Sequence, residues 1–319
     1  MTLIETLKKQ GGVTLLRRYW KSGAFFTAFG ELLLLGKSRT SLEILRLSAE
    51  LKTKQKLKKM YISKLKEFDK SYDATIPHKS SNKVWVCWFQ GIENAPKLVQ
   101  RCYESIKRNL TESDIILITE SNMHEYILFP DYIMKKWKLG QITHTHMTDL
   151  LRIALLTKYG GTWIDATVFC TRKQNVIPSY FFDSELFFFQ CLKPGRDGHA
   201  TYISSWYMSA KSNNKILAAV QYLCNEYWKE NKELLDYFLL HDFVSIVLEY
   251  YPEEWKKIIP RDNATPHELL LILFEDYNEQ MWGAISDQVP FHKLSYKFED
   301  EKFKQKGTFY EKVVLGEDK

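Results

Sequence analysis

The chain has 319 residues, of which 45% are hydrophobic and 26% are charged, so it can bury a sizeable core. Residues 1–70 contain 16 Lys and Arg against 6 Asp and Glu, whereas the remaining residues contain 29 against 33. This mildly acidic larger part argues against nucleic-acid binding, which needs a basic groove. The five cysteines have neither CxxC nor metal-ligand spacing, and this predicts small buried thiols in a reducing compartment.

Residues 1–75 are predicted to be a basic helical region, separated from a domain over residues 76–319 by a polar linker. The apolar run 24–36 contains Glu31 and is shorter than the about 20 residues of a membrane span. No small-residue cleavage site follows it, so a secretory signal is not predicted either. The Lys-rich helix expected over residues 41–68 suits an anionic membrane surface, or packing on the domain or on a second copy. These alternatives stay open.

The domain is predicted to have an α/β fold, because strand and helix patterns alternate along it. Such alternation implies a parallel-type sheet with helices on both faces. The tail from residue 299 is charged and is expected to be loose. The expected strands are 83–89, 114–119, 162–164, 186–190 and 200–210, and the expected helices are 95–108, 142–159, 214–230 and 233–250.

The stretch 142–167 reads as a helix, a Gly-Gly stop and a short strand. Thr143 or Thr145 can cap the helix, which ends at the consecutive glycines 160 and 161. Asp149 and Arg152 are three positions apart, so they are neighbours on one face of a largely apolar helix. Asp165 ends the strand, where open α/β sheets bind ligands. We therefore expect these three charges to converge on one crevice.

This stretch resembles the sugar-nucleotide core of glycosyltransferase family 32, and more narrowly the capsular polysaccharide synthesis proteins of bacteria. The clostridial glucosylating toxins share this core. The resemblance extends from about Lys83 to Phe298 and implies the A-type glycosyltransferase fold. It is carried by Asp-Leu-Leu-Arg at 149–152, Lys-Tyr-Gly-Gly at 158–161, Trp-Ile-Asp-Ala-Thr at 163–167, Trp-Val-Cys-Trp-Phe-Gln-Gly at 85–91, Ser-Ser-Trp at 204–206, Asp-Tyr-Phe at 236–238, Pro-His at 266–267 and Phe-His-Lys-Leu-Ser-Tyr-Lys at 291–297.

By this resemblance, Trp88 would stack on the nucleotide base, for which an indole is a large apolar platform. Asp149 would accept hydrogen bonds from sugar or ribose hydroxyls, and Arg152 would lie near the sugar and phosphates. Ser205 would line the donor or acceptor subsite. Alternatively, Trp88 is a core residue, and Asp149 and Arg152 form a structural ion pair within their helix. Such pairs are less common on a buried helix.

Asp165 corresponds to the first carboxylate of the family's Asp-x-Asp motif, which usually holds a divalent cation on the diphosphate. The third position here is Thr167, a poor metal ligand, so the metal mode is in doubt. Asp165 could instead bind the ribose, or hold Mn²⁺ or Mg²⁺ with His292 as a further ligand. Lys293 and Lys297 could neutralise phosphate oxygens directly and reduce the need for a metal.

Two further carboxylates, Asp242 and Asp236, are candidates for stabilising the developing oxocarbenium ion or aligning the acceptor. Asp242 lies in an apolar helix pattern, where a buried polar group needs partners. A structural hydrogen bond or a helix-surface position is the commoner explanation for both.

The sequence thus predicts a hexosyltransferase that moves a sugar from a nucleotide diphosphate, such as a UDP-sugar, to a saccharide acceptor in capsule or surface polysaccharide assembly. The resemblance implies retention of anomeric configuration. The basic N-terminal region suggests a lipid-linked acceptor and peripheral binding at the cytoplasmic face of the membrane; a homo-oligomer is compatible with it. The alternative to an enzyme is a non-catalytic protein that binds a nucleotide sugar or acts as a scaffold.

Overall fold

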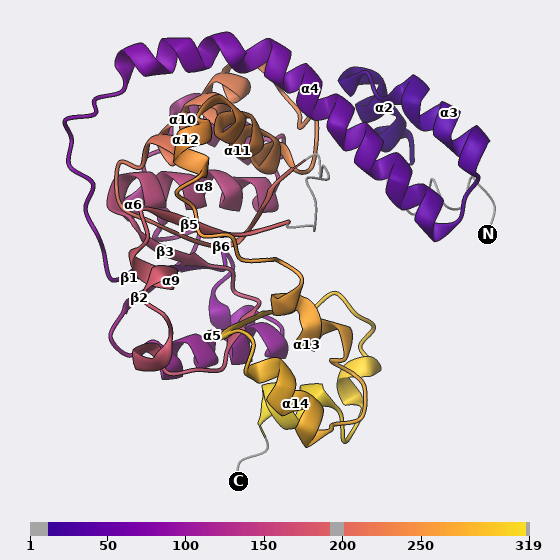
Figure 1. The fold of residues 1–319 in the computed structure, drawn as a ribbon, viewed down its shortest axis with the longest axis vertical. Coiled ribbons are helices and arrows are strands. Elements are labelled where there is room, and N and C mark those ends of the chain that lie inside the picture. Colours follow the sequence, from indigo (N-terminus) through magenta and orange to yellow (C-terminus); the bar gives the residue numbers. More distant parts are fainter. Residues whose placement is uncertain (1–11, 192–200, 317–319) are drawn as a thin grey trace.

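A computed structural model describes residues 12–191 and 201–316, and its centre is a five-stranded sheet with the order β2-β1-β3-β6-β5 (Figure 1). β1 pairs in parallel with β2 and β3, whereas β6 is antiparallel to β3 and β5. The α/β fold is therefore confirmed, and the expected parallel arrangement holds for three of the strands. These strands are β1 (Lys83–Cys87), β2 (Asp114–Ile118), β3 (Gly161–Ile164), β5 (Leu186–Gln190) and β6 (Ile203–Ala210).

Helices cover both faces of this sheet (Figure 1). Side chains alternate along β1, so Trp85 and Cys87 pack with the layer of α8, α10 and α11, while Val84 and Val86 pack on the α5 face. The helices of the domain are α5 (Lys97–Asn109), α6 (Met123–Tyr126), α7 (Asp131–Lys138), α8 (His144–Tyr159), α9 (Tyr180–Asp183), α10 (Lys215–Glu230), α11 (Leu239–Tyr250), α12 (Pro252–Trp255), α13 (Glu268–Leu271) and α14 (Glu279–Ser286).

A small antiparallel sheet of β4 (Val168–Cys170) and β7 (Phe291–Lys293) joins the C-terminal part of the chain to the segment after β3. The expectation of a loose tail from residue 299 is wrong. Phe309, Tyr310 and Val314 are buried and belong to the core on the α5 face. These apolar side chains, which lie among charged ones, anchor the tail.

Of the region predicted to be helical over residues 1–75, residues 1–11 lie outside the described residues. Residues 12–71 form three helices, α2 (Gly12–Ser22), α3 (Phe25–Leu35) and the long α4 (Arg39–Ser71). The second half of α4 lies across α10 and α11, and its residues Leu57, Tyr61, Leu65 and Phe68 join the main core. Figure 1 shows α2 and α3 at the far end of α4, projecting away from the sheet. None of the helices in the described part of the chain has the length and apolar content that a bilayer span requires.

The turn between α8 and β3 lets the start of β3 approach the backbone of β1 closely. Thr143 caps α8 by accepting a hydrogen bond from the backbone N–H of His146, at 3.2 Å. Gly160 and Gly161 then have φ values of 69° and 93°, which only glycine adopts without strain. A Cβ on Gly161 would lie 2.4 Å from the carbonyl oxygen of Lys83 on β1.

We expect Gly161→Ala to lower the free energy of unfolding by roughly 3 kcal/mol or more, because backbone strain adds to a clash that the strand pair cannot relieve. The matched control is Gly283→Ala in α14, where no atom lies within 4 Å of the added Cβ. That change should leave stability unchanged or raise it by up to about 1 kcal/mol. Urea denaturation of both variants measures the difference, and equal midpoints would contradict the structure of this turn.

Candidate active site

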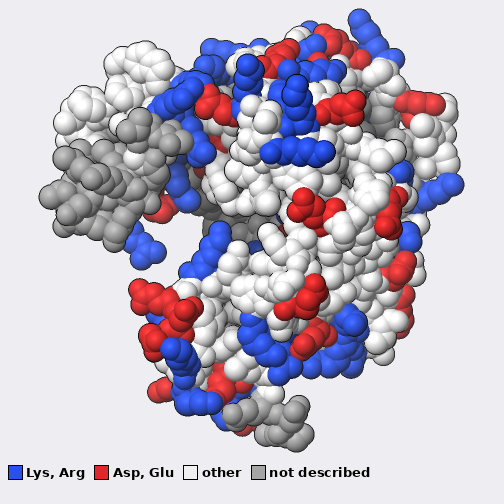
Figure 2. Space-filling model, turned by 180° about the vertical axis from the view of Figure 1, so that it is seen from behind, with Lys and Arg blue, Asp and Glu red and all other residues white. Residues whose placement is uncertain are grey.

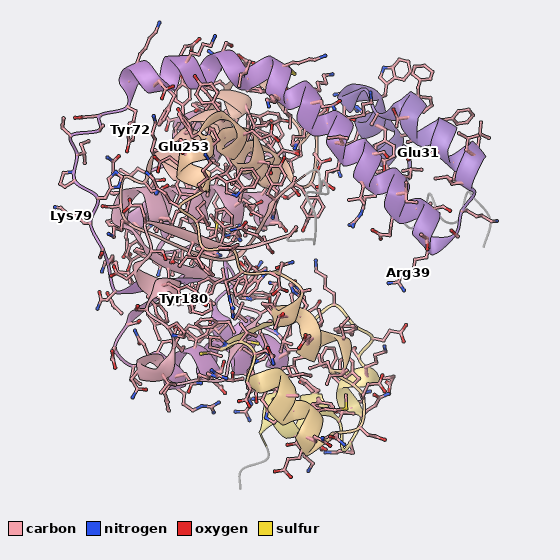
Figure 3. All side chains as sticks on the ribbon, in the orientation of Figure 1. Glu31, Arg39, Tyr72, Lys79, Tyr180 and Glu253 are labelled. Carbon is pink, nitrogen blue, oxygen red and sulfur yellow. The ribbon has the colours of Figure 1, made fainter. Side chains whose placement is uncertain are left out.

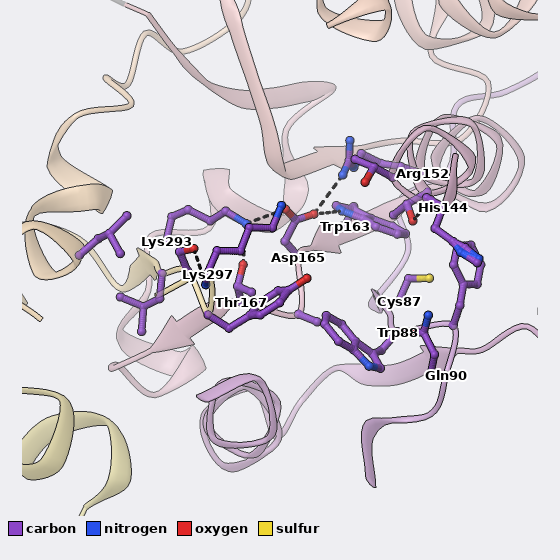
Figure 4. Close-up of a pocket in the computed structure, with 18 of the residues that line it drawn as sticks. Cys87, Trp88, Gln90, His144, Arg152, Trp163, Asp165, Thr167, Lys293 and Lys297 are labelled. Carbon is purple, nitrogen blue, oxygen red and sulfur yellow. Dashed lines mark hydrogen bonds and ion pairs between the residues drawn. The ribbon is translucent and has the colours of Figure 1, made fainter. Parts of the chain in front are cut away.

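The carboxyl ends of β1 and β3, the first half of α8 and the end of β7 surround a cavity of about 600 Å³ (Figure 4). β1 and β3 run in parallel with Trp85 beside Trp163, so the residues that follow both strands lie at the same edge of the sheet. The described lining residues are Cys87, Trp88, Phe89, Gln90, Asn94, His144, Thr145, Thr148, Arg152, Trp163, Asp165, Ala166, Thr167, Tyr237, His267, Leu270, Lys293, Leu294, Ser295, Tyr296 and Lys297.

Asp165 makes the central polar contacts of this cavity, since both of its carboxylate oxygens accept hydrogen bonds from side chains (Figure 4). Oδ1 accepts from Nη2 of Arg152 at 3.0 Å and from Nε1 of Trp163 at 2.9 Å. Oδ2 accepts from Nζ of Lys293 at 2.8 Å. Burial would raise the pKa of Asp165, but the charges of Lys293 and Arg152 outweigh it and hold that pKa below its usual value. Asp165 is thus an ionised carboxylate at neutral pH.

Arg152 is held from behind by a chain of polar contacts. Its Nη1 donates to Oδ1 of Asp149 at 2.7 Å, and both residues are buried. Nε1 of Trp228 donates to Nε2 of His146 at 2.9 Å, so the ring hydrogen of His146 is on Nδ1, 3.6 Å from Oδ2 of Asp149. Burial would raise the pKa of Asp149, but His146 and Arg152 keep it below its usual value. The guanidinium therefore points at Asp165 in a fixed orientation.

Positive charge dominates the cavity. Among the described lining residues, Arg152, Lys293 and Lys297 carry cationic groups and Asp165 alone carries a carboxylate. Lys293 also donates to Oγ1 of Thr167, at 2.6 Å. Such an arrangement suits an anionic ligand, because Asp165 and, behind the wall, Asp149 offset only two of the three positive charges.

Aromatic side chains form the other part of the wall. Trp88 is partly exposed and packs edge to face with Tyr296, with ring centroids 5.6 Å apart at an interplanar angle of 77°. The guanidinium of Arg152 lies 4.9 Å from the ring centroid of Trp163. Trp88 thus gives a flat ligand a surface to stack on, while the buried Trp163 packs against the guanidinium of Arg152.

Several lining residues were given no role from the sequence. Gln90 and Asn94 follow β1, and His144 begins α8, so their places at a strand end and a helix start were usable signals. Tyr296 lies in a quoted motif without a role. Tyr237, which is 52% exposed, comes from the loop before α11 and likewise lies in a quoted motif without a role.

Trp88, Arg152, Asp165, Lys293 and Lys297 are all in the cavity wall. The expectation that His292 joins Asp165 there needs correction. Adjacent residues of a strand point to opposite sides, and Lys293 faces the cavity, so His292 faces away. His292 is fully buried, its Nε2 lies 3.3 Å from Oγ1 of Thr171, and burial lowers its pKa to about 4.

Asp242 and Asp236 are not lining residues, which corrects their expected place at the reacting sugar. Asp242 is fully buried in α11, without a hydrogen-bond partner within the described residues. Burial, together with Asp236 and Glu50, raises the pKa of Asp242 well above its usual value. Oδ1 of Asp236 accepts from the backbone N–H of Phe238 at 2.6 Å, and this bond lies in the turn that precedes α11.

Ser205 and Asp149 are close to the site but behind its wall. β6 reaches Asp165 through its backbone, since the carbonyl of Trp206 accepts from the Asp165 N–H at 2.8 Å, and the Ser205 side chain is buried. The donor-binding role expected of Asp149 is likewise corrected: it contacts Arg152 and does not line the cavity. Asp149 is thus a positioning residue.

Curated proteins similar to this chain are named as glycosyltransferases. O-glycosyltransferase braB of Annulohypoxylon truncatum is 31% identical over 105 residues, which are 30% of this chain and 25% of that protein. O-glycosyltransferase PaGT of Phomopsis amygdali is 24% identical over 151 residues, 43% of this chain and 36% of that protein. The matches thus span only about a quarter to a third of these relatives.

The solved structure of the PaToxG glycosyltransferase is similar at a TM-score of 0.40 and 14% identity, covering 62% of this chain and 79% of that one. The family model described as capsular polysaccharide synthesis protein matches residues 38–313, which include α4 but neither α2 nor α3, and every lining residue of the cavity. This match spans most of the chain and shows that the chain belongs to the capsular polysaccharide synthesis protein family.

Proposed function

We propose that this protein is a glycosyltransferase that binds a nucleotide diphosphate sugar in the cavity and transfers the hexose to a saccharide acceptor during surface polysaccharide assembly. The observation that carries the proposal is the ionised Asp165, held between Arg152 and Lys293 at a strand end within an open cavity. Family membership and the names of the similar proteins support the reaction class.

Each part of such a donor has a chemical counterpart in the wall. Trp88 offers the face of an indole to the base, which for a UDP-sugar is uracil. Lys293, Lys297 and Arg152 supply donors for the diphosphate oxygens, and Asp165 is an acceptor for sugar or ribose hydroxyls. As the bond to the anomeric carbon breaks, negative charge grows on the leaving diphosphate, and fixed cations stabilise that charge without reorganising. We propose retention of configuration on the family resemblance alone.

A panel of UDP-, GDP- and ADP-hexoses tests the proposal by the release of nucleoside diphosphate. We expect one donor to be hydrolysed slowly by the wild type, and Asp165→Asn to lower the rate by about 100-fold, because the carboxylate orients both cations and the sugar. The control is Asp287→Asn, whose side chain is 82% exposed. Thermal melting verifies folding. A wild type that binds nucleotide and releases none from any donor would instead favour a scaffold.

The base platform has a separate test. Trp88→Ala should weaken UDP binding by about 10- to 100-fold, since stacking a base on an aromatic ring contributes roughly 1–3 kcal/mol. Binding of inorganic pyrophosphate should change little, because it has no base. Trp88→Phe, which keeps a ring, is the matched variant. Competition calorimetry measures both ligands, and parallel losses for UDP and pyrophosphate would show that Trp88 acts on the phosphates or on the fold.

We also propose that α2 and α3 bind an anionic membrane, where a lipid-linked acceptor would lie. Phe26, Leu33 and Leu34 are 74%, 70% and 85% exposed on α3, and such clustered apolar exposure marks an interaction surface. The exposed Lys37 and Arg39 follow directly, and the chain here is basic. Figure 2 shows blue Lys and Arg side chains along the upper edge and white, uncharged ones at the projecting end, where Figure 3 labels Glu31 and Arg39.

Flotation with vesicles of phosphatidylcholine and phosphatidylglycerol tests this surface. Replacing Phe26, Leu33 and Leu34 together by Ser should weaken binding by about tenfold or more, given the apolar area lost. Three exposed apolar residues of the catalytic part, Leu128, Leu139 and Val176, replaced by Ser serve as the control. Deleting the whole region would be a poor test, because α4 contributes to the core. Unchanged flotation, with a loss of self-association in sedimentation, would assign the surface to a second copy.

A further inference from the structure

Lys293 occupies the position between the two polar side chains of the Asp-Ala-Thr motif. Its Nζ lies 2.8 Å from Oδ2 of Asp165 and 2.6 Å from Oγ1 of Thr167 (Figure 4). A hard divalent cation shared by residues 165 and 167 would need oxygen ligands from both side chains. The same oxygens here hold an ammonium group that belongs to the chain.

The remaining donors around this position do not suit Mg²⁺ or Mn²⁺. Asp165 is the single carboxylate among the described lining residues, and its two oxygens already accept from three side chains. Thr167 offers a neutral hydroxyl, and His292 faces away. Within residues 12–191 and 201–316 there is no group of three or more His, Cys, Asp or Glu side chains that could hold a metal ion. A dication would also meet repulsion from Lys293 and Arg152.

We infer that the Lys293 ammonium, held by Asp165 and Thr167, takes the place of a divalent cation at the donor diphosphate, with Lys297 and Arg152 beside it. This inference rests on the proposed function. The described wall carries three cations and one carboxylate, and Asp149 behind the wall also pairs with Arg152, so one positive charge remains in excess to attract the negative charge of a sugar diphosphate. Donor binding is therefore independent of metal, and the cavity needs no ion from solution.

This arrangement gives a physical reason for a threonine at position 167. A second carboxylate at position 167 would neutralise Lys293 and compete with the phosphate oxygens for its hydrogens. A hydroxyl orients the ammonium by a hydrogen bond and leaves its charge for the ligand. Lys293 itself is fixed by β7, where its backbone pairs with Val168.

Calorimetry of the full chain with UDP, GDP and ADP, in EDTA and again with Mn²⁺, tests the inference. We expect the same dissociation constant in both conditions, within about twofold, for the nucleotide that binds. Lys293→Met should weaken binding by about 10- to 100-fold in both. Lys257→Met, at a lysine outside the cavity wall and 62% exposed, is the matched control and should bind as the wild type does.

Binding that requires Mn²⁺, or that Mn²⁺ strengthens more than tenfold, would overturn the inference and leave the proposed function intact. Absence of binding by any of the nucleotides in both conditions would overturn both. The double variant Thr167→Asp with Lys293→Ser adds a converse test, since it restores two carboxylates and removes the ammonium. We expect its nucleotide binding to depend on Mn²⁺, whereas that of the wild type does not; equal behaviour of the two would count against Lys293 as the replacement.

Discussion

The pairing of the Asp165 carboxylate with two cations ties together three parts of the chain. Arg152 lies 13 positions before Asp165 and Lys293 lies 128 positions after it. Charges that are largely removed from water are tolerated when they are paired and hydrogen-bonded, so each of these groups lowers the cost of burying the others. The site consequently exists only once α8, β3 and β7 have assembled, and its geometry depends on the whole domain.

The contacts behind this pairing reduce the freedom of the cations before any ligand arrives. Trp228 fixes the ring hydrogen of His146, which faces Asp149, and Asp149 holds one edge of the Arg152 guanidinium. The other edge is directed at Asp165. A cation oriented in this way loses little entropy when it meets a phosphate, and preorganised groups stabilise developing charge best. The buried polar groups of α8 therefore serve the cavity although several of them do not line it.

Sequence patterns predict the site residues whose position follows from local rules. They do not predict which side of a strand or which face of a helix points to the cavity. The three-residue spacing of Asp149 and Arg152 and the strand end at Asp165 are local features, and the structure brings these residues together. His292 and Lys293 have the same sequence context, but strand alternation sends only one of them to the cavity. Choosing between them requires the register of β7 on β4, which pairs residues more than a hundred positions apart. Asp242 was similarly misplaced, because its helix turns that face into the core.

A cation supplied by the fold also explains why the C-terminal part of the chain is packed so firmly. β7 is short, and within the described residues its only strand partner is β4, so its position also depends on the packing of its side chains. Phe309, Tyr310 and Val314 fill the core on the α5 face, and the backbone N–H of Tyr310 bonds to the carbonyl of Leu273 at 2.7 Å. A metal ion finds its position from its ligands, whereas a lysine on a strand is placed by packing elsewhere. Phe309, Tyr310 and Val314 share one core cluster with Phe291 of β7, so the tail and the strand that carries Lys293 are placed by the same core.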